Sequence, residues 1–332
     1  MTPALPQRRI GAFDVSAIGL GCMNLSHAYG QPPARDAAQA LLLRALDLGV
    51  TLFDTAALYG FGANEELVGE VLAPHRHRFT LASKCGMQGI DGKRVIDGRP
   101  ATLKATCEAS LKRLRTDVID LYYLHRWDRR VPIEDSVGAL AELVREGKIR
   151  AIGLSEVSAA TLRRAHAVHP IAALQTEYSL WTRNPEIAVL EVCRELGTAF
   201  VAFSPVGRGF LPGTLRDVSG LDAKDIRRAM PRFAPANYAA NLRLLDGLGE
   251  VAREVGCTLA QLSLAWLLAR GEHIVPIPGT TNIAHLEEDL GAVDVRLDAA
   301  QMARLDTLIH RGNVAGARYN AATQTEIDTE EF

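Results

Sequence analysis

The sequence predicts an α/β fold, a (β/α)8 or TIM barrel that spans residues 1–332 as one domain. Eight short apolar runs alternate with helical patterns along the chain. Strands that are buried on both faces are apolar throughout, as these runs are. Alternation of strands and helices predicts parallel, right-handed units, and eight such units suit closure into a barrel. The length of 332 residues also allows two domains, but one barrel with extra loops fits it equally well.

The first half of the chain predicts a small hairpin arm at 9–15, followed by four strands and four helices. Helix 134–146 is typical, with an apolar i, i+3, i+4, i+7 pattern, acids in its first turn and Gly147 after it. A glycine-rich loop is expected at 86–100. The four strands are expected at 17–23, 51–55, 79–84 and 120–125, and the helices at 37–48, 64–72, 101–114 and 134–146.

The second half continues the alternation and adds a long loop after the seventh strand. This irregular insert runs from 207 to about 237, and a polar C-terminal tail at 312–332 is expected to be loosely held. The strands are expected at 149–155, 173–178, 199–205 and 274–279, and the helices at 159–168, 185–196, 239–255, 258–269, 283–290 and 298–311.

An open, doubly wound sheet is the alternative fold. Such a sheet binds a dinucleotide through a glycine fingerprint in its first turn. The stretch that begins Gly19-Leu20-Gly21 has Asn24 where the third glycine of that fingerprint would stand. The barrel is therefore favoured.

Composition excludes several classes of function. Lys and Arg total 37 against 39 Asp and Glu, so there is no electrostatic footprint for nucleic acid or an anionic membrane. The start of the chain has no apolar signal region, and the longest apolar runs are too short to cross a bilayer. The five cysteines are scattered without a C-x-x-C pair, which favours free thiols in a reducing cytoplasm and disfavours a zinc site.

Four titratable residues stand at the carboxyl ends of three successive strands. Asp54 ends one strand, and Tyr59 follows it after a short turn. Lys84 ends the next strand, and His125 ends the one after that. Because the reactive groups of barrels lie at the carboxyl ends of the strands, we expect these four side chains to share one pocket.

These four residue types together form a device for transferring a proton to a carbonyl or from an alcohol. A phenol has a pKa of about 10, and a neighbouring ammonium lowers it. A carboxylate keeps the buried ammonium charged, and a neutral imidazole can orient a substrate oxygen. Singly, each residue has an ordinary explanation, such as a helix cap for Asp54 or a solvated loop position for Lys84. The combination at successive strand ends favours the functional interpretation.

Along nearly its whole length the chain resembles the aldo-keto reductase superfamily. It is most similar to the branch of plant and bacterial reductases that act on bulky ketones and aldehydes. Each motif is weak alone, but their order and spacing are specific. The matching motifs are at 18–23, 53–56 with 59–60, 83–84, 120–125, 153–156, 175–179, 204–209 and 276–280.

The resemblance implies a barrel that binds NADPH without a dinucleotide-binding sheet. It implies that Tyr59 donates the proton, that Lys84 and Asp54 tune it, and that His125 orients the carbonyl. Ser155 and Gln175 would hold the nicotinamide carboxamide, Phe203 would stack on the ring, and the loop 204–210 would wrap the pyrophosphate. The implied coenzyme contacts are Met23, Asp54, Ser155, Gln175, Phe203, Ser204, Pro205, Val206, Gly207, Arg208, Gly209, Phe210, Ile277, Gly279, Thr280, Thr281, Asn282, His285, Glu288 and Asp289.

The sequence departs from the family pattern near the expected 2′-phosphate site. After Thr280 the family often places a lysine or arginine, whereas this chain continues with Thr281 and Asn282. Asp289 stands where an asparagine is common, so NADH stays possible beside NADPH. Glu156 replaces an asparagine of many relatives, and its carboxylate could accept from the carboxamide.

The substrate pocket is expected to be apolar and to take small carbonyl compounds. Leu58, Trp127 and Tyr178 flank the strand ends and are expected to border it, although each could instead pack within the barrel. The sequence thus predicts a cytoplasmic, NAD(P)H-dependent and reversible reductase of aldehydes and ketones that needs no metal. Two alternatives stay open. One is an NAD-linked sugar or polyol dehydrogenase of the same fold, and the other is a nucleotide-sensing, non-catalytic subunit like the β-subunits of potassium channels.

Overall fold

The computed structural model describes residues 5–90 and 92–332. Residues 1–4 are part of the N-terminal stretch without an apolar signal region, and Asp91 is part of the expected loop 86–100. Both lie outside the described residues.

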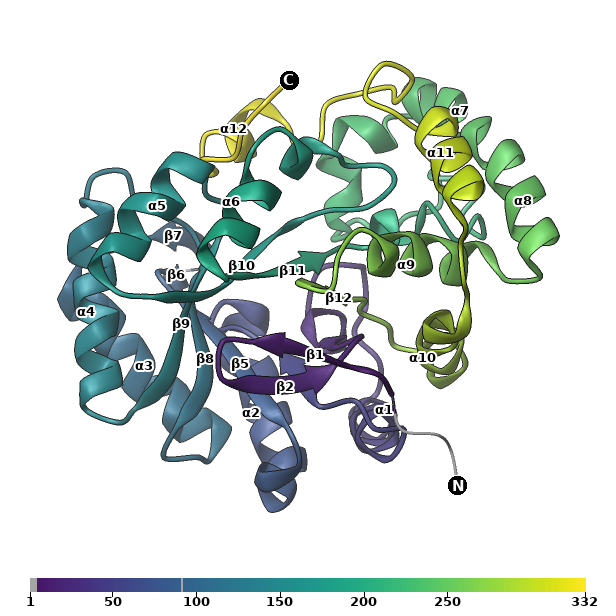
Figure 1. The fold of residues 1–332 in the computed structure, drawn as a ribbon. Coiled ribbons are helices and arrows are strands. Elements are labelled where there is room, and N and C mark those ends of the chain that lie inside the picture. The colour runs from purple at the N-terminus through teal and green to yellow at the C-terminus, as the bar shows by residue number, and fades with distance from the viewer. Residues whose placement is uncertain (1–4, 91) are drawn as a thin grey trace.

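Eight parallel strands form one sheet in the order β12-β11-β10-β9-β8-β5-β4-β3 (Figure 1). The edge strands β3 and β12 face each other, because Gly19 N–H donates to Pro276 O and Gly21 N–H to Pro278 O, both at 3.0 Å. The predicted eight-stranded barrel with an N-terminal hairpin is confirmed. The strands are β3 (Leu20–Gly21), β4 (Leu52–Asp54), β5 (Thr80–Cys85), β8 (Ile119–Leu124), β9 (Ile149–Ser155), β10 (Ile171–Glu177), β11 (Ala199–Phe203) and β12 (Ile274–Ile277).

Glycine is required where the barrel closes. A Cβ on Gly21 would lie 2.9 Å from Ile277 O, and a Cβ on Gly279 would lie 2.9 Å from Gly21 O. Side-chain carbons do not approach backbone oxygens so closely, so any other residue would push the edges apart. The wall of the barrel beside the first and last strands therefore depends on these glycines.

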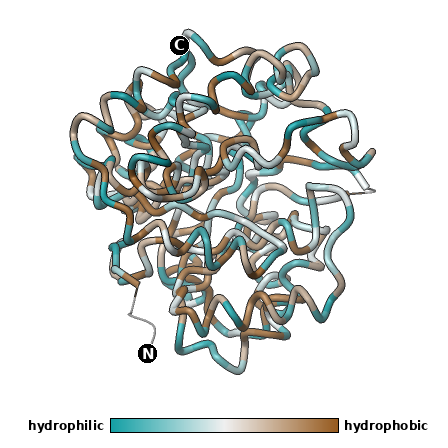
Figure 2. Tube along the Cα trace, turned by 90° about the vertical axis from the view of Figure 1, so that its right-hand side faces the viewer, coloured by the Kyte–Doolittle hydropathy of each residue, from teal (hydrophilic) through white to brown (hydrophobic). Residues whose placement is uncertain are grey.

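The N-terminal hairpin covers the amino ends of the strands. Its strands β1 (Gln7–Ile10) and β2 (Phe13–Ser16) supply Ile10 and Val15 to the hydrophobic cluster inside the barrel. The guanidinium of Arg8 donates to Gly271 O at 2.7 Å, just before β12. A second, larger hydrophobic cluster fills the layer between strands and helices, and hydrophilic stretches lie mainly on the outer turns (Figure 2). Since the hairpin closes one end, the site must open at the other.

Helices surround the sheet, and three of them lie together at one side of the barrel: α7, α8 and α11 (Figure 1). The helices are α1 (Arg35–Asp47), α2 (Ala63–Leu72), α3 (Pro100–Leu114), α4 (Ile133–Arg145), α5 (Ala159–Val168), α6 (Val189–Leu196), α7 (Pro235–Leu242), α8 (Leu244–Val255), α9 (Leu259–Ala269), α10 (Ile283–Leu290), α11 (Ala299–Leu308) and α12 (Ala321–Gln324).

Four predicted elements differ from the structure. The helix expected at 185–196 is a 3-10 turn, η4 (Asn184–Glu186), followed by α6 from Val189. The strand expected at 17–23 is short, since residues Met23–Leu25 turn into a 3-10 helix, η1. The helix expected at 239–255 is two helices that meet at Arg243, and the first starts earlier because Pro235 favours a helix start. The expected loop 86–100 contains a hairpin of β6 (Met87–Ile90) and β7 (Lys93–Ile96).

The expectation of a loosely held C-terminal tail is wrong. Arg318 is 6% exposed and its guanidinium binds both carboxylate oxygens of Glu156, with Nη1 at 3.1 Å from Oε1. Ile327 is buried, and Asp328 forms a β-bridge with Val157. The tail and α12 accordingly lie beside α5 and α6 (Figure 1). A buried ion pair thus holds the polar tail against the mouth of the barrel.

Candidate active site

The four predicted titratable residues converge at the open end of the barrel. Asp54 is the last residue of β4, Lys84 lies near the end of β5, and His125 directly follows β8. Tyr59 begins η2 (Tyr59–Gly62), the 3-10 helix after β4. Lys84 Nζ forms an ion pair with Asp54 and lies 3.4 Å from Tyr59 Oη. The rings of Tyr59 and His125 pack edge to face, with centroids 5.8 Å apart.

Lys84 is the centre of this group, and it is completely buried. Its ammonium also donates to Thr55 O at 2.8 Å, so its three donors all have partners. Burial alone would lower the pKa of Lys84, but Asp54 and Tyr59 more than offset it and raise that pKa above its ordinary value. Lys84 therefore stays charged at neutral pH.

Tyr59 differs from the sequence expectation in the direction of its pKa. Burial raises the pKa of the Tyr59 phenol above its ordinary value, while Lys84 pulls it back down. The net shift of the Tyr59 pKa is upward because burial and the nearby carboxylate of Asp54 outweigh the effect of the Lys84 ammonium. At neutral pH the phenol therefore carries its proton, as a proton donor must.

His125 is neutral at physiological pH. Burial, with further contributions from Arg126 and Lys84, lowers the pKa of His125 well below its ordinary value. Its Nδ1 is buried and has no hydrogen-bond partner in the described part of the chain. A neutral imidazole can donate one hydrogen bond to a substrate oxygen without competing with Tyr59 for a proton.

The four residues stand beside a cavity of about 910 Å³, near the upper end of the range for small-molecule sites. Tyr59, His125 and Asp54 reach its wall, whereas Lys84 stands behind them. Most of the predicted coenzyme and substrate residues line the same cavity. They are Met23, Leu58, Ser155, Gln175, Phe203, Ser204, Pro205, Val206, Arg208, Gly209, Ile277, Gly279, Thr280, Thr281, His285, Glu288 and Asp289.

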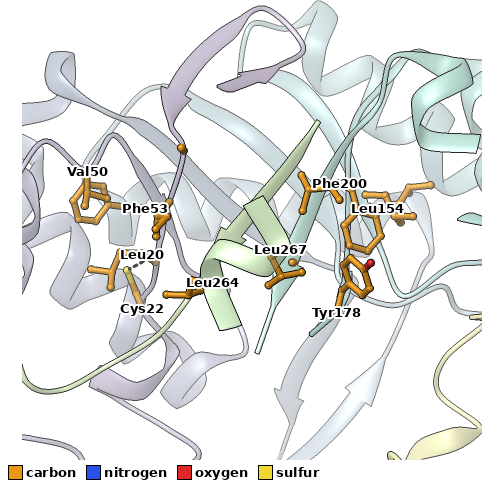
Figure 3. Close-up of a cluster of buried hydrophobic side chains, with 14 of the residues drawn as sticks. Leu20, Cys22, Val50, Phe53, Leu154, Tyr178, Phe200, Leu264 and Leu267 are labelled. Carbon is orange, nitrogen blue, oxygen red and sulfur yellow. Dashed lines mark hydrogen bonds between the residues drawn. The ribbon is translucent and has the colours of Figure 1, made fainter. Parts of the chain in front are cut away.

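Two predicted substrate residues lie elsewhere. Tyr178 is fully buried between the sheet and its helices, beside Leu154 and Phe200 (Figure 3), and its hydroxyl is 2.7 Å from Glu186 Oε1. The Trp127 indole N–H donates to Val131 O at 2.9 Å, and the ring packs against the outer core. Neither side chain borders the cavity, because both point outward from the barrel.

Three predicted coenzyme residues also lie outside the cavity wall. Phe210 is buried against Trp181, with ring centroids 4.0 Å apart, and Gly207 sits beneath the same indole. Asn282 caps α10 by accepting from Ala284 N–H at 2.8 Å. Packing and helix capping explain these residues without a ligand.

Glu156 does not face the cavity either. Its carboxylate accepts from Arg318 and from the backbone N–H of Glu177, at 3.0 Å. The expectation that it accepts from a coenzyme amide is therefore wrong. Sequence reasoning could not foresee this, because Arg318 is 162 positions away in the chain.

The loop that follows β11 has an unusual backbone. Ser204, Gly207, Arg208 and Gly209 all have positive φ, between 49° and 86°. Such turns direct several backbone N–H groups to one side and make a cradle for an anion. The Arg208 guanidinium lines the cavity but is 2.5 Å from Glu177 Oε2, so its charge is already compensated. The backbone is therefore the main feature of this loop for phosphate.

The far part of the cavity is acidic. Glu288 and Asp289 line it together with His285 and Thr281. Burial and the neighbouring Glu288 raise the pKa of Asp289 to about 7. The residues that line this part include no lysine or arginine after Thr280, as the sequence indicated.

Several lining residues were missed by sequence reasoning because they come from the segment after β3, the hairpin β6–β7, the loop after β11 and the C-terminal tail. Their contribution depends on how those segments fold over the mouth. They include Asn24, His27, Tyr29, Met87, Arg94, Arg227, Tyr319, Asn320 and Thr323.

In the described ranges 5–90 and 92–332, no group of three or more His, Cys, Asp or Glu side chains is placed to hold a metal ion. No helix within these ranges is long and apolar enough to cross a membrane.

The fold and the site define a barrel enzyme that can move a proton to or from an oxygen at a buried phenol. Residues 17–310 match the model of the aldo/keto reductase family. The chain is 44% identical over 310 residues to probable aldo-keto reductase 1 of Glycine max, covering 92% of this chain and 89% of that protein. It is 43% identical over 331 residues to aldo-keto reductase yakc [NADP(+)] of Schizosaccharomyces pombe, covering 98% and 97%.

Solved structures agree. The glycerol dehydrogenase AKR11B4 from Gluconobacter oxydans superposes with a TM-score of 0.84 at 28% identity, covering 91% of this chain and 94% of that one. An aldo/keto reductase from Klebsiella pneumoniae in complex with NADP and acetate superposes with a TM-score of 0.69 at 29% identity, covering 99% and 100%. The chain belongs to the aldo/keto reductase family. It is an oxidoreductase that reduces carbonyl groups with NAD(P)H.

Proposed function

We propose that this enzyme reduces small aldehydes and ketones with NADPH as its preferred coenzyme, and that Tyr59 donates the proton. The observation that carries the proposal is the buried Lys84, ion-paired with Asp54 and 3.4 Å from Tyr59 Oη, next to a neutral His125. A structural ion pair alone would not require a phenol at the ammonium or a neutral imidazole at the cavity wall.

The cavity fits a nicotinamide dinucleotide. Its volume, the anion cradle after β11 and the polar groups at the ends of β9 and β10 all suit such a ligand. Ser155 offers a hydroxyl, and Gln175 donates its amide to Asp54 at 2.8 Å, which leaves its carbonyl oxygen for the carboxamide. Phe203 lines the cavity at the end of β11, where its ring can face the nicotinamide.

Each residue of the tetrad has one task in the reaction. The bound coenzyme supplies a hydride for the carbonyl carbon. Tyr59 gives its proton to the carbonyl oxygen, and the charged Lys84 stabilises the phenolate that results. Asp54 holds Lys84 charged and in place, and His125 donates a hydrogen bond that orients the carbonyl. The same groups serve the reverse reaction, in which the phenolate takes a proton from an alcohol.

Support for NADPH comes from relatives, since yakc carries NADP(+) in its name and the Klebsiella structure holds NADP. The acidic part of the cavity opposes it. Asp289, if it faces the 2′-phosphate, repels that group when it is ionised. We therefore expect Asp289→Asn to tighten NADPH binding at least about fivefold and to leave NADH binding nearly unchanged. Fluorescence titration with both coenzymes measures this.

The pKa of about 7 for Asp289 adds a pH dependence. The carboxyl is neutral below that value and charged above it, so NADPH binding should weaken between pH 6 and pH 8. The 2′-phosphate also titrates in this range, and the Asp289→Asn variant serves as the control for it. If the variant shows the same pH dependence as the wild type, Asp289 does not face the phosphate.

Two alternatives are kept, and specific observations favour the first of them. A polyol dehydrogenase is supported by the acidic far end of the cavity and by the likeness to a glycerol dehydrogenase. Tighter binding of NADH than of NADPH would favour it. A nucleotide-sensing subunit would bind coenzyme with negligible turnover. A panel of aldehydes and ketones, followed by absorbance at the nicotinamide band, decides between that subunit and the enzyme.

We further propose that the enzyme works in the cytoplasm. All five cysteines are free, and four of them are buried, which suits a reducing compartment. Fractionation of expressing cells would show in which compartment the enzyme is found.

A further inference from the structure

Nearly all cationic side chains at the cavity have an acidic partner. Lys84 pairs with Asp54, Arg208 with Glu177, Arg227 with Asp225 and Arg94 with Glu326. Arg126 is different. In the part of the chain that the structure describes, its guanidinium donates only to His125 O at 2.7 Å and to Ser155 Oγ at 3.2 Å, and it forms no ion pair.

Arg126 also lies close to the reacting groups. It directly follows His125, and its side chain lines the same cavity. Its Nε is buried and, among the described residues, has no hydrogen-bond partner. Its charge reaches the reacting groups: it acts with burial to lower the pKa of His125, and it opposes the rise that burial gives the pKa of Tyr59. A half-buried guanidinium without a counter-charge is well placed to bind an anionic ligand.

The neighbouring basic groups leave one positive charge to be matched. Burial and Arg94 lower the pKa of His27, so this lining residue is a neutral donor. The charge of Arg94 is shared with Glu326, at 2.6 Å. One net positive charge suits a monoanion, whereas a phosphate dianion would leave a negative charge in excess. A guanidinium binds the planar carboxylate group through two parallel hydrogen bonds.

We propose that the substrate is an aldehyde or ketone that carries a carboxylate, and that Arg126 binds this carboxylate beside the carbonyl held by Tyr59 and His125. The proposal rests on the proposed function, because it names the substrate class of the same site. Coenzyme alone does not account for Arg126, since a neutral carboxamide would leave its charge unmatched.

The test compares two substrates of similar shape that differ in charge. With saturating NADPH, we expect kcat/KM for 4-formylbenzoate to exceed that for its methyl ester at least about tenfold. In Arg126→Met the carboxylate substrate should lose at least about tenfold, mainly through KM, and the ester should change far less. Arg126→Lys, which keeps the charge but not the planar fork, should lie between. Arg163→Met is the control, because Arg163 is an exposed arginine that pairs with Glu195 on the outer helices.

A binding measurement separates this proposal from the proposed function. Benzoate should bind the enzyme–NADPH complex in the wild type and in Arg163→Met, and at least about tenfold more weakly in Arg126→Met. If no carbonyl is reduced but benzoate shows this pattern, the proposed function fails and the anion site stands. Equal rates for acid and ester, or benzoate binding that ignores Arg126, overturn the proposal. A loss of NADPH affinity in Arg126→Met without a change in substrate preference also overturns it, since Arg126 would then serve the coenzyme.

Discussion

Replacing Tyr59 by phenylalanine is expected to lower the rate of carbonyl reduction at least about a hundredfold and to leave coenzyme affinity nearly intact. The change removes only the phenolic oxygen, 3.4 Å from Lys84 Nζ, and keeps the ring that packs against His125. Without that oxygen, the tetrad group left at the carbonyl is the neutral imidazole of His125, which is a much weaker acid than a phenol. Single-turnover absorbance at the nicotinamide band measures the rate, and fluorescence titration measures the affinity.

The melting temperature of the variant serves as a control for its folding. Tyr59 is buried, but its hydroxyl has Lys84 as its only polar partner among the described residues, so the melting temperature should change little. A Tyr59→Phe enzyme that keeps more than a tenth of the wild-type rate would remove Tyr59 from the mechanism. A variant that loses coenzyme binding as well would assign it a structural role.

Replacing Lys84 by methionine is expected to damage both activity and stability. The carboxylate of Asp54, 2% exposed, would lose its counter-charge, and breaking a buried ion pair costs about 3–5 kcal/mol of unfolding free energy. The phenolate formed at Tyr59 would lose its stabilising ammonium, so the rate should fall at least about a hundredfold. Denaturant unfolding and single-turnover kinetics measure the two effects separately.

The double variant Asp54→Asn with Lys84→Met distinguishes the two effects. It removes both charges, so most of the lost stability should return, while activity should stay low because the ammonium is still missing. A double variant that regains activity would show that Lys84 serves only to neutralise Asp54. A Lys84→Met variant that is as stable as the wild type would mean that Asp54 takes up a proton or solvent instead.

The parts of the site that lie on strands could be predicted from the sequence. Asp54, Lys84 and His125 each end an apolar run, and parallel strands bring their carboxyl ends to one edge. The local pattern therefore determines where these groups lie. The same reasoning predicted the number of strands, because each short run is bounded by polar or turn residues.

The parts that depend on contacts distant in sequence could not be predicted. Nothing near Arg208 indicates that Glu177 would take its charge, and nothing near Glu156 indicates Arg318. Tyr178 directly follows β10 and points outward, and its contact with Glu186 depends on the packing of the segments that cover the sheet. A shift of one residue along a strand turns each side chain to the other face of the sheet. An apolar run does not specify which of its residues point inward.

The pKa of Tyr59 illustrates the same limit. The sequence indicates which charges meet, but the balance between Lys84 and burial depends on how much water reaches the phenol. The result is a protonated phenol beside a charged lysine. This arrangement suits proton donation in the direction of reduction.

The most direct test of the account is the fate of deuterium carried at the transferable position of NADPH. We expect the wild-type enzyme to deliver the deuterium to the former carbonyl carbon of the alcohol, while the hydroxyl hydrogen comes from water through Tyr59. In Tyr59→Phe the same labelled product should form at least about a hundredfold more slowly. Deuterium that is lost to water, or an equal rate of labelling in both enzymes, would contradict it.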